Sequence, residues 1–322
     1  MKKTLIILSV LLLLIANLSY SAGKRGGLVL AFDDGYPCWI KTVAPLLQQV
    51  GGVATVFVNN QRVHSGYLSF EDLLTLQNKY GWEINTHTYH HFNSVRYVEK
   101  YGLDKWIKDE VEASVSEFES KGIKKIRSLV FPFNAFNDIT AGYVAKRFDS
   151  FRRYSPLPLT KKLNPDKSYP GTTIDLGYFV PLRQLKMWVN FSRMQNKLLF
   201  VYSHQVFSED HYIRGTIKEV GPDYIIAKES FTPLKDSALC MVPTLKTRIQ
   251  DTDIKVLGFE NGNKIKVLSN NLPKLTKPGE NFIVGPCYGI PYKEFKEFIE
   301  YTAKKIPFYT LSQALEILKS NN

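Results

Sequence analysis

Hydrophobic residues along the first two thirds of the chain follow two alternating spacings. Short apolar runs at 28–32, 53–58 and 197–203 are typical of buried β-strands. Between such runs, apolar residues recur every three or four positions, as on the buried face of an amphipathic helix, most clearly over 107–118. Strands and helices that alternate in this way predict parallel β/α units, arranged as a barrel or as a doubly wound sheet.

The same reasoning places the other elements of this region. We expect further strands at 82–85, 128–131 and 151–154, and further helices over 39–50, over 70–80, from 138, and over 182–189. Because the sites of parallel β/α barrels lie at the carboxyl ends of the strands, polar residues directly after a strand are the first candidates for function.

A different pattern begins near residue 206. Helical spacing fades, and short β-rich runs appear at 224–227, 238–242, 254–257 and 264–268. The last two runs flank the turn-forming sequence 260–263 and predict a β-hairpin. This stretch therefore predicts a small all-β insert.

Helical spacing returns after the insert. A helix is expected from Tyr292, followed by a short strand at 307–309 and a closing helix over 311–318. We therefore predict an α/β chain in which 22–205 and 287–322 form the β/α domain. The segment 206–286 forms the β-rich insert, placed before the last helices.

The first residues form a separate unit. Two lysines precede an apolar run at 5–15, and small residues follow at Ser19 and Ser21. This order is typical of a secretory signal peptide, which we place at 1–21. The protein is then exported to the periplasm, the cell envelope or the medium. The alternative is an uncleaved membrane anchor, although the run is short for a bilayer span. In either case membrane contact is expected only through this segment.

Composition narrows the choice of partners. The chain has 322 residues, of which 44% are hydrophobic and 22% charged, so it can build a large core. The formal net charge of +12 favours contact with anionic cell-envelope polymers, or is simply a solvated basic surface. No compact basic stripe or nucleic-acid motif is present, so we expect no nucleic-acid partner. The sequence does not set the oligomeric state.

Three cysteines follow the signal segment. In an exported protein two of them can pair, and we expect Cys240 to pair with Cys287 and to leave Cys38 as a free thiol.

Two polar clusters follow predicted strands and carry the candidate chemistry. Asp33 and Asp34 end one apolar run, and His87 and His91 come directly after another strand. One carboxylate and two imidazoles can hold a divalent metal and leave coordination positions open for water. A second carboxylate can take the proton of that water. His204 also follows a strand, so all of these groups are expected at one end of the fold.

Taken together, the motifs resemble those of the polysaccharide deacetylases, carbohydrate esterase family 4. The sequence at 30–35 is similar to the family's first motif, Thr-Phe-Asp-Asp-Gly, and 81–91 to its second, His-Ser/Thr-x-x-His after Glu-Ile. The sequence at 131–134 resembles the third motif and 202–204 the last, Leu-x-His. The similarity spans about 28–204 and resumes near Tyr292, outside the insert.

The resemblance implies an irregular (β/α) barrel and a metal-dependent deacetylase. Carried over to this chain, it makes Asp33 the catalytic base and Asp34, His87 and His91 the metal ligands. Zinc (Zn2+) is the expected ion, and Co2+, Ni2+ or Fe2+ would suit the same donors. The resemblance also makes His204 the acid that protonates the departing amine.

Further residues complete the expected pocket. The resemblance implies that the backbone N–H of Phe133, after Pro132, helps to hold the oxyanion. Tyr36 is a candidate for stacking on a sugar ring, although core packing explains it equally well. Asp175 is our candidate for the acid that orients His204.

The sequence departs from the family pattern in two places. Family members often carry an arginine shortly before the third-motif proline, where it pairs with the base. Here Val130 and Phe131 occupy that stretch, and Arg127 lies too early on the strand, so no partner for Asp33 is evident. Asn134 also replaces the usual glycine.

We therefore expect an exported, metal-dependent hydrolase that removes acetyl groups from an N-acetylated polysaccharide containing N-acetylglucosamine. One alternative keeps the site and changes the substrate to an O-acetyl ester or a small amide. The other is a glycan-binding protein on the same fold that has lost turnover, which the missing arginine favours.

Overall fold

A computed structural model describes residues 26–155, 157–171, 175–176, 180–235, 239–243, 254–269 and 272–320. The predicted signal segment 1–21 lies outside these residues. Within them, no helix combines the length and the apolar character that crossing a lipid bilayer requires.

A parallel sheet forms the centre of the larger unit, and its strands occur in the order β6-β8-β1-β2-β3-β4-β5-β7. The strands are β1 (Gly27–Asp34), β2 (Thr55–Val58), β3 (Glu83–Thr86), β4 (Ser128–Leu129), β5 (Ser150–Arg153), β6 (Leu159–Thr160), β7 (Ser168–Pro170) and β8 (Leu198–Ser203). Of these, β6 alone runs antiparallel to its neighbour. A short strand, β17 (Phe308–Tyr309), also pairs with β1.

The sheet curls into a nearly closed barrel. Its two end strands, β6 and β7, contact each other, and Asp175 forms a parallel bridge to Tyr202 on β8. The predicted α/β class and irregular (β/α) barrel are therefore confirmed.

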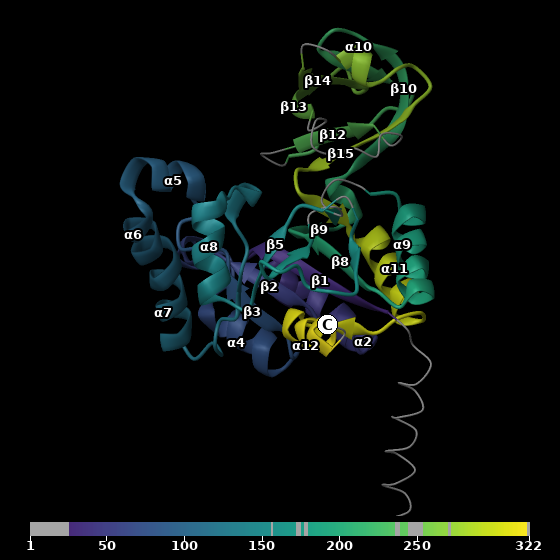
Figure 1. The fold of residues 1–322 in the computed structure, drawn as a ribbon. Coiled ribbons are helices and arrows are strands. Elements are labelled where there is room, and N and C mark those ends of the chain that lie inside the picture. Colours follow the sequence, from purple (N-terminus) through teal and green to yellow (C-terminus); the bar gives the residue numbers. More distant parts are fainter. Residues whose placement is uncertain are drawn as a thin grey trace, which may run out of the picture.

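Helices surround this sheet (Figure 1). They are α2 (Ala44–Gln49), α3 (Asn60–His64), α4 (Phe70–Asn78), α5 (Ser94–Tyr101), α6 (Leu103–Trp106), α7 (Ala113–Ser120), α8 (Asp138–Arg147), α9 (Leu182–Gln195), α11 (Tyr292–Ala303) and α12 (Leu311–Ser320). Wider π-helical turns at Trp39–Val43 and Ile107–Glu112 lead into α2 and α7.

The strand β1 shows how the sequence directs its side chains. Successive side chains of a strand point to opposite faces. Leu30 and Phe32 pack among the residues beneath the helices, whereas Val29 and Ala31 belong to the cluster inside the barrel. The same alternation turns Asp33 into the barrel. Apolar residues of α12 join the same cluster and pack against these inward side chains.

The predicted all-β insert is a closed antiparallel barrel with the strand order β10-β11-β14-β13-β12-β15. Its strands are β10 (Ile213–Val220), β11 (Tyr224–Ala227), β12 (Leu239–Pro243), β13 (Ile254–Glu260), β14 (Lys264–Leu268) and β15 (Asn281–Pro286), and a short helix, α10 (Leu272–Leu275), adjoins them. The predicted hairpin is the pair β13–β14. The insert has its own apolar core, and 206–286 remains our proposed extent for this unit.

A second, two-stranded sheet lies between the two barrels. In it, β9 (Gln205–Phe207) pairs in parallel with β16 (Gly289–Pro291), so the chain enters and leaves the insert side by side (Figure 1). The insert is thus attached directly after His204, at the end of β8.

The predicted disulfide between Cys240 and Cys287 is confirmed, and Cys38 is a free thiol. The bond joins β12 to the turn that follows β15 and closes a loop with a sequence separation of 47 residues.

Loss of this bond is expected to destabilise the insert. Replacing both Cys240 and Cys287 by Ser should lower the free energy of unfolding by about 4 kcal/mol, because a loop of this length is released in the unfolded chain. Urea unfolding with and without a thiol reductant measures the effect. The reductant should weaken the native protein and leave the double variant unchanged; equal stability of the two proteins would contradict the prediction.

Candidate active site

Asp33 lies in the barrel with a buried arginine as its partner. The exposed fractions of Asp33 and Arg152 are 1% and 3%. The Arg152 guanidinium donates to both carboxylate oxygens, with Nη1–Oδ1 3.1 Å and Nη2–Oδ2 2.5 Å. Burial by itself raises the pKa of Asp33, but the charge of Arg152, with smaller effects of His87 and His204, holds that pKa below its ordinary value. Asp33 is therefore ionised at neutral pH, as a general base must be.

This pair corrects the sequence analysis, which found no partner for the base. Arg152 comes from β5, whereas Arg127, before β4, pairs with Asp149. The guanidinium of Arg152 also lies 4.2 Å from the ring centroid of Tyr202. The signal for Arg152 in the sequence was a charged residue within a predicted strand, at a position whose side chain points into the barrel.

Asp34 reaches the site because the chain turns at the end of β1. Its φ of 89° is left-handed, and Gly35 follows with φ 116°. Arg62 binds one carboxylate oxygen, with Nη2–Oδ2 3.2 Å, and its guanidinium lies 4.8 and 4.7 Å from the ring centroids of Tyr36 and Tyr67. Asp34 is thereby oriented with Oδ1 free of this contact. Tyr36 thus lies beside the Asp34–Arg62 pair.

The two predicted histidines lie on the loop after β3. This loop has left-handed residues at Thr88 and His91, which let both imidazoles converge without a helix. The Nδ1 of His87 lies 2.7 Å from the carbonyl oxygen of Val130. Donation of Nδ1–H to that carbonyl leaves the lone pair on Nε2, the nitrogen that faces His91.

Glu110 holds the same loop in place through hydrogen bonds. It is fully buried, and Oε2 accepts from the backbone N–H of His90 at 3.0 Å while Oε1 lies 2.6 Å from His90 Nδ1. Its own carbonyl accepts from the backbone N–H of Tyr89 at 2.9 Å. His90 is therefore turned away from the ligand position and supports the loop.

The predicted metal triad, Asp34, His87 and His91, comes together in space. The two Nε2 atoms are 3.2 Å apart, and Asp34 Oδ1 lies 3.3 Å from that of His91 and 3.8 Å from that of His87. Ligands held tetrahedrally at roughly 2.0–2.1 Å from one ion lie about 3.3–3.4 Å apart, so the spacing fits zinc.

Two further observations support the fit. Asp34 Oδ1 is buried and has no hydrogen-bond partner among the described residues, an arrangement that a cation would satisfy. Burial lowers the pKa of both imidazoles, and the neighbouring His87 helps to lower that of His91 to about 3. Both are therefore neutral at neutral pH, which is the form that binds a metal.

His204 and Asp175 face each other at the end of β8. Asp175 Oδ1 lies 3.8 Å from His204 Nδ1, too long for a hydrogen bond but close enough for charge to act. Asp175 is 3% exposed, and the Tyr202 hydroxyl hydrogen-bonds to it. The Trp39 indole N–H donates to the His204 carbonyl at 2.7 Å. The predicted acid and its predicted orienting carboxylate are thus neighbours, and their roles remain predictions.

Phe133 and Pro132 lie beside the triad. They belong to a 3-10 turn at Pro132–Asn134, in which Phe133 has a left-handed φ of 59°. The Phe133 ring packs edge-on against His91, with the ring centroids 4.7 Å apart, and its exposed fraction is 69%. Pro132 is buried. The predicted oxyanion function of the Phe133 N–H remains a prediction.

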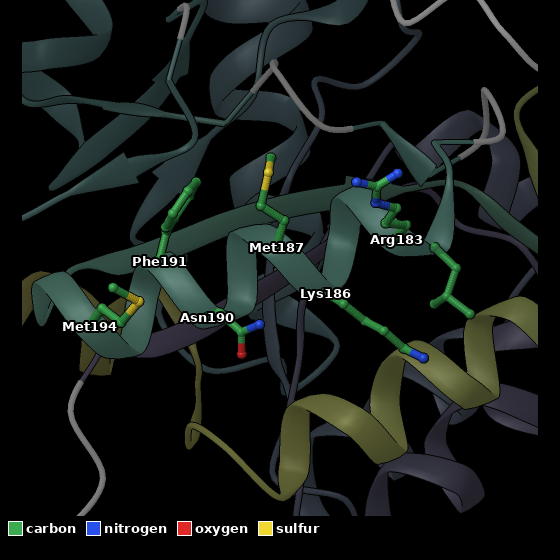
Figure 2. A pocket seen from close by; sticks show the side chains of 7 residues that line it. Arg183, Lys186, Met187, Asn190, Phe191 and Met194 are labelled. Carbon is green, nitrogen blue, oxygen red and sulfur yellow. The ribbon is translucent and has the colours of Figure 1, made fainter.

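A separate hollow lies along α9, away from these residues. Leu182, Arg183, Lys186, Met187, Asn190, Phe191 and Met194 line it. Figure 2 shows Met187 and Phe191 pointing to the same side, whereas Lys186 reaches toward α11, where its Nζ lies 2.7 Å from Glu297. None of the predicted site residues lines this hollow.

Cys38 is not among the candidate site residues. Burial raises the pKa of its thiol to about 11, so it is protonated at neutral pH. The described triad does not include it.

The fold and the triad define a (β/α) barrel with a cluster of possible metal ligands at the carboxyl ends of its strands. Residues 21–148 match the family model of polysaccharide deacetylases. Over this stretch the chain resembles that family, as the motifs predicted, and the stretch contains the predicted base, the triad and the 3-10 turn. His204, Asp175 and Arg152 lie beyond it.

Solved structures of this class are similar in part. One is a family 4 carbohydrate esterase from Streptomyces lividans in complex with acetate, at 15% identity and a TM-score of 0.41, covering 56% of this chain and 80% of that one. Another is the peptidoglycan deacetylase PdaC from Bacillus subtilis, at 18% identity and a TM-score of 0.38, covering 56% and 75%. No curated protein matches the sequence.

Proposed function

We propose that this protein is a metal-dependent deacetylase that removes acetyl groups from an N-acetylated glycan. The observation that carries the proposal is the convergence of Asp34, His87 and His91 beside the Asp33–Arg152 pair, within a stretch of the polysaccharide deacetylase family. The resemblance to this family supports hydrolysis of an acetyl amide or ester. The N-acetylglucosamine polymer as substrate and zinc as cofactor are our further proposals.

Each side chain of the site has its own role in the proposed reaction. A zinc ion held by the triad would supply a Lewis acid that lowers the pKa of a water ligand to about 7 and polarises the acetyl carbonyl. Asp33, kept ionised by Arg152, accepts the proton of the water that attacks the carbonyl carbon. His204, oriented by Asp175, gives a proton to the nitrogen that leaves, so the amide bond breaks to acetate and an amine.

The arrangement also bears on the non-catalytic alternative. That alternative drew its support from the arginine missing at its usual place, and the acid that orients His204 was only a candidate. Arg152 supplies the first from a different strand, and Asp175 lies opposite His204. We therefore favour turnover over binding alone.

We further propose that the chain is exported, because its first 21 residues have the order of a signal peptide. An N-terminal residue of Ala22 in protein recovered outside the cytoplasm would support cleavage after Ser21. An intact N-terminus in a membrane fraction would favour the anchor instead.

Acetate release is the decisive measurement. Zinc-loaded protein is expected to release acetate from N-acetylglucosamine oligomers, and a chelator should stop the release until zinc is restored. O-acetylated xylan and small acetamides form the comparison panel. Release from those substrates alone would change the substrate class, and glycan binding without any release would favour the non-catalytic alternative.

A further inference from the structure

We propose that Tyr288 forms a second sugar-binding position beside His204, so that the insert contributes directly to recognition of the glycan. The occupant is the pyranose ring next to the sugar that loses its acetyl group. This inference rests on the proposed function, because it extends the same site.

Tyr288 lies where the insert returns to the catalytic unit. It is in the turn between β15 and β16, and its ring centroid is 5.3 Å from that of His204. Its exposed fraction is 43%, so the ring packs on the histidine and still presents surface to solvent. An exposed aromatic ring beside a candidate proton donor offers an apolar surface on which a bound sugar can pack.

The position of Tyr288 is fixed from both sides. The preceding Cys287 is bonded to Cys240, and the Tyr288 carbonyl accepts from the Gln205 backbone N–H at 3.2 Å. A Cβ at Gly289 would lie 2.6 Å from a neighbouring aromatic ring, so the backbone is closely packed there. Tyr288 itself has a left-handed φ of 63°, which a bulky residue adopts only where the surroundings enforce it.

Phe133 shows the same combination next to His91. It is exposed, has a left-handed φ of 59°, and packs its ring on a histidine of the site. Two exposed aromatic rings therefore flank the site, one from the barrel and one from the turn that ends the insert. The axial C–H groups of a pyranose form an apolar face that stacks on an aromatic ring, whose face carries partial negative charge. A glycan chain provides such faces in succession, whereas a small acetyl ester does not.

The test compares substrates of increasing length on the full chain. Acetate release is measured on N-acetylglucosamine oligomers from the dimer to the hexamer, and on a small acetyl ester. In Tyr288→Ala we expect kcat/KM for the hexamer to fall about 3- to 10-fold, mainly through KM, with the ester unchanged. Tyr288→Phe should retain the native preference. Tyr101→Ala removes another exposed tyrosine, on α5, and should leave every substrate unaffected.

Binding of the hexamer to zinc-free protein, followed by calorimetry, separates this inference from the proposed function. Weaker hexamer binding by Tyr288→Ala than by Tyr288→Phe and Tyr101→Ala supports the subsite even if the protein releases no acetate. Equal losses on the hexamer and the ester would overturn the inference, because Tyr288 would then act only by positioning His204. Unchanged hexamer binding and turnover in a folded Tyr288→Ala protein would overturn it as well.

Discussion

Replacing His87 with Ala is expected to abolish zinc binding and acetate release together. His87 supplies one of two Nε2 atoms that lie 3.2 Å apart, and its ring is oriented by the Val130 carbonyl. Loss of a residue that merely orients a ligand weakens metal affinity by about 10- to 100-fold, so loss of a ligand should exceed roughly 100-fold. Acetate release should fall below detection, because the water then returns to a pKa of about 15.7.

Metal content after dialysis and chelator competition measure the affinity, and acetate release measures the activity. The matched control is His64→Ala, since His64 is an exposed histidine paired with Glu117 outside the triad. That variant should bind zinc and turn over as the native protein does. Native zinc content and acetate release in His87→Ala would remove the basis of the proposed function.

Replacing Arg152 with Met is expected to destabilise the protein by about 3–5 kcal/mol and to abolish activity at neutral pH. The change leaves a fully buried Asp33 carboxylate without its counter-charge, and an unpaired buried charge has a cost of that order. Urea unfolding gives the stability. The neighbouring Arg153→Met is a matched control, because Arg153 is exposed and pairs with Asp166 at the surface. Its effect should not exceed about 1 kcal/mol.

The pH dependence of this variant has a definite sign. In the native protein the pKa of Asp33 is lowered, so its contribution to stability is present above the unfolded pKa and is lost as pH falls below about 4. Without the positive charge of Arg152, less remains to counter the effect of burial, and the pKa of Asp33 should rise. The variant should then lose stability as pH increases through that raised pKa, and the acid limb of its activity should move to higher pH.

A double variant tests whether the loss comes from the pair. The protein with both Asp33→Asn and Arg152→Met should be less destabilised than the sum of the two single changes. The double change removes both charges, so no unpaired charge remains buried. Strict additivity, or native pH dependence in Arg152→Met, would show that the two side chains do not act together.

Local sequence signals predicted most of the catalytic unit. The apolar run that contains Leu30 and the helical spacing at 182–189 each correspond to an observed element, β1 and α9. The triad was also predictable, because its members lie at the end of a strand or in the loop that follows one. Long-range pairing was not, and Arg152 shows why. It meets Asp33 across 119 positions of sequence, and only closure of the barrel brings the two together.

The insert was predictable in class, but not all of its strands were found from the sequence. The strand β10 was missed because its sequence, Ile213–Val220, is interrupted by glycine and charged residues and is buried at only two of eight positions. Tyr288 was missed for a related reason. Nothing in the local sequence shows that the turn after a disulfide returns to a histidine more than eighty positions earlier.

The strands that pair with β1 affect how the chain folds during its synthesis. β1 is the first strand of the barrel, yet its partners include β8 and β17, and the inner cluster includes α12 near the other end of the sequence. During synthesis one edge of β1 therefore stays unpaired until β8 has been made, and the part that pairs with β17 stays unpaired until nearly the end of the chain. A fragment that stops at residue 148 would keep that edge open, ready to pair with other chains. Folding is expected to be slow and to benefit from chaperones during synthesis.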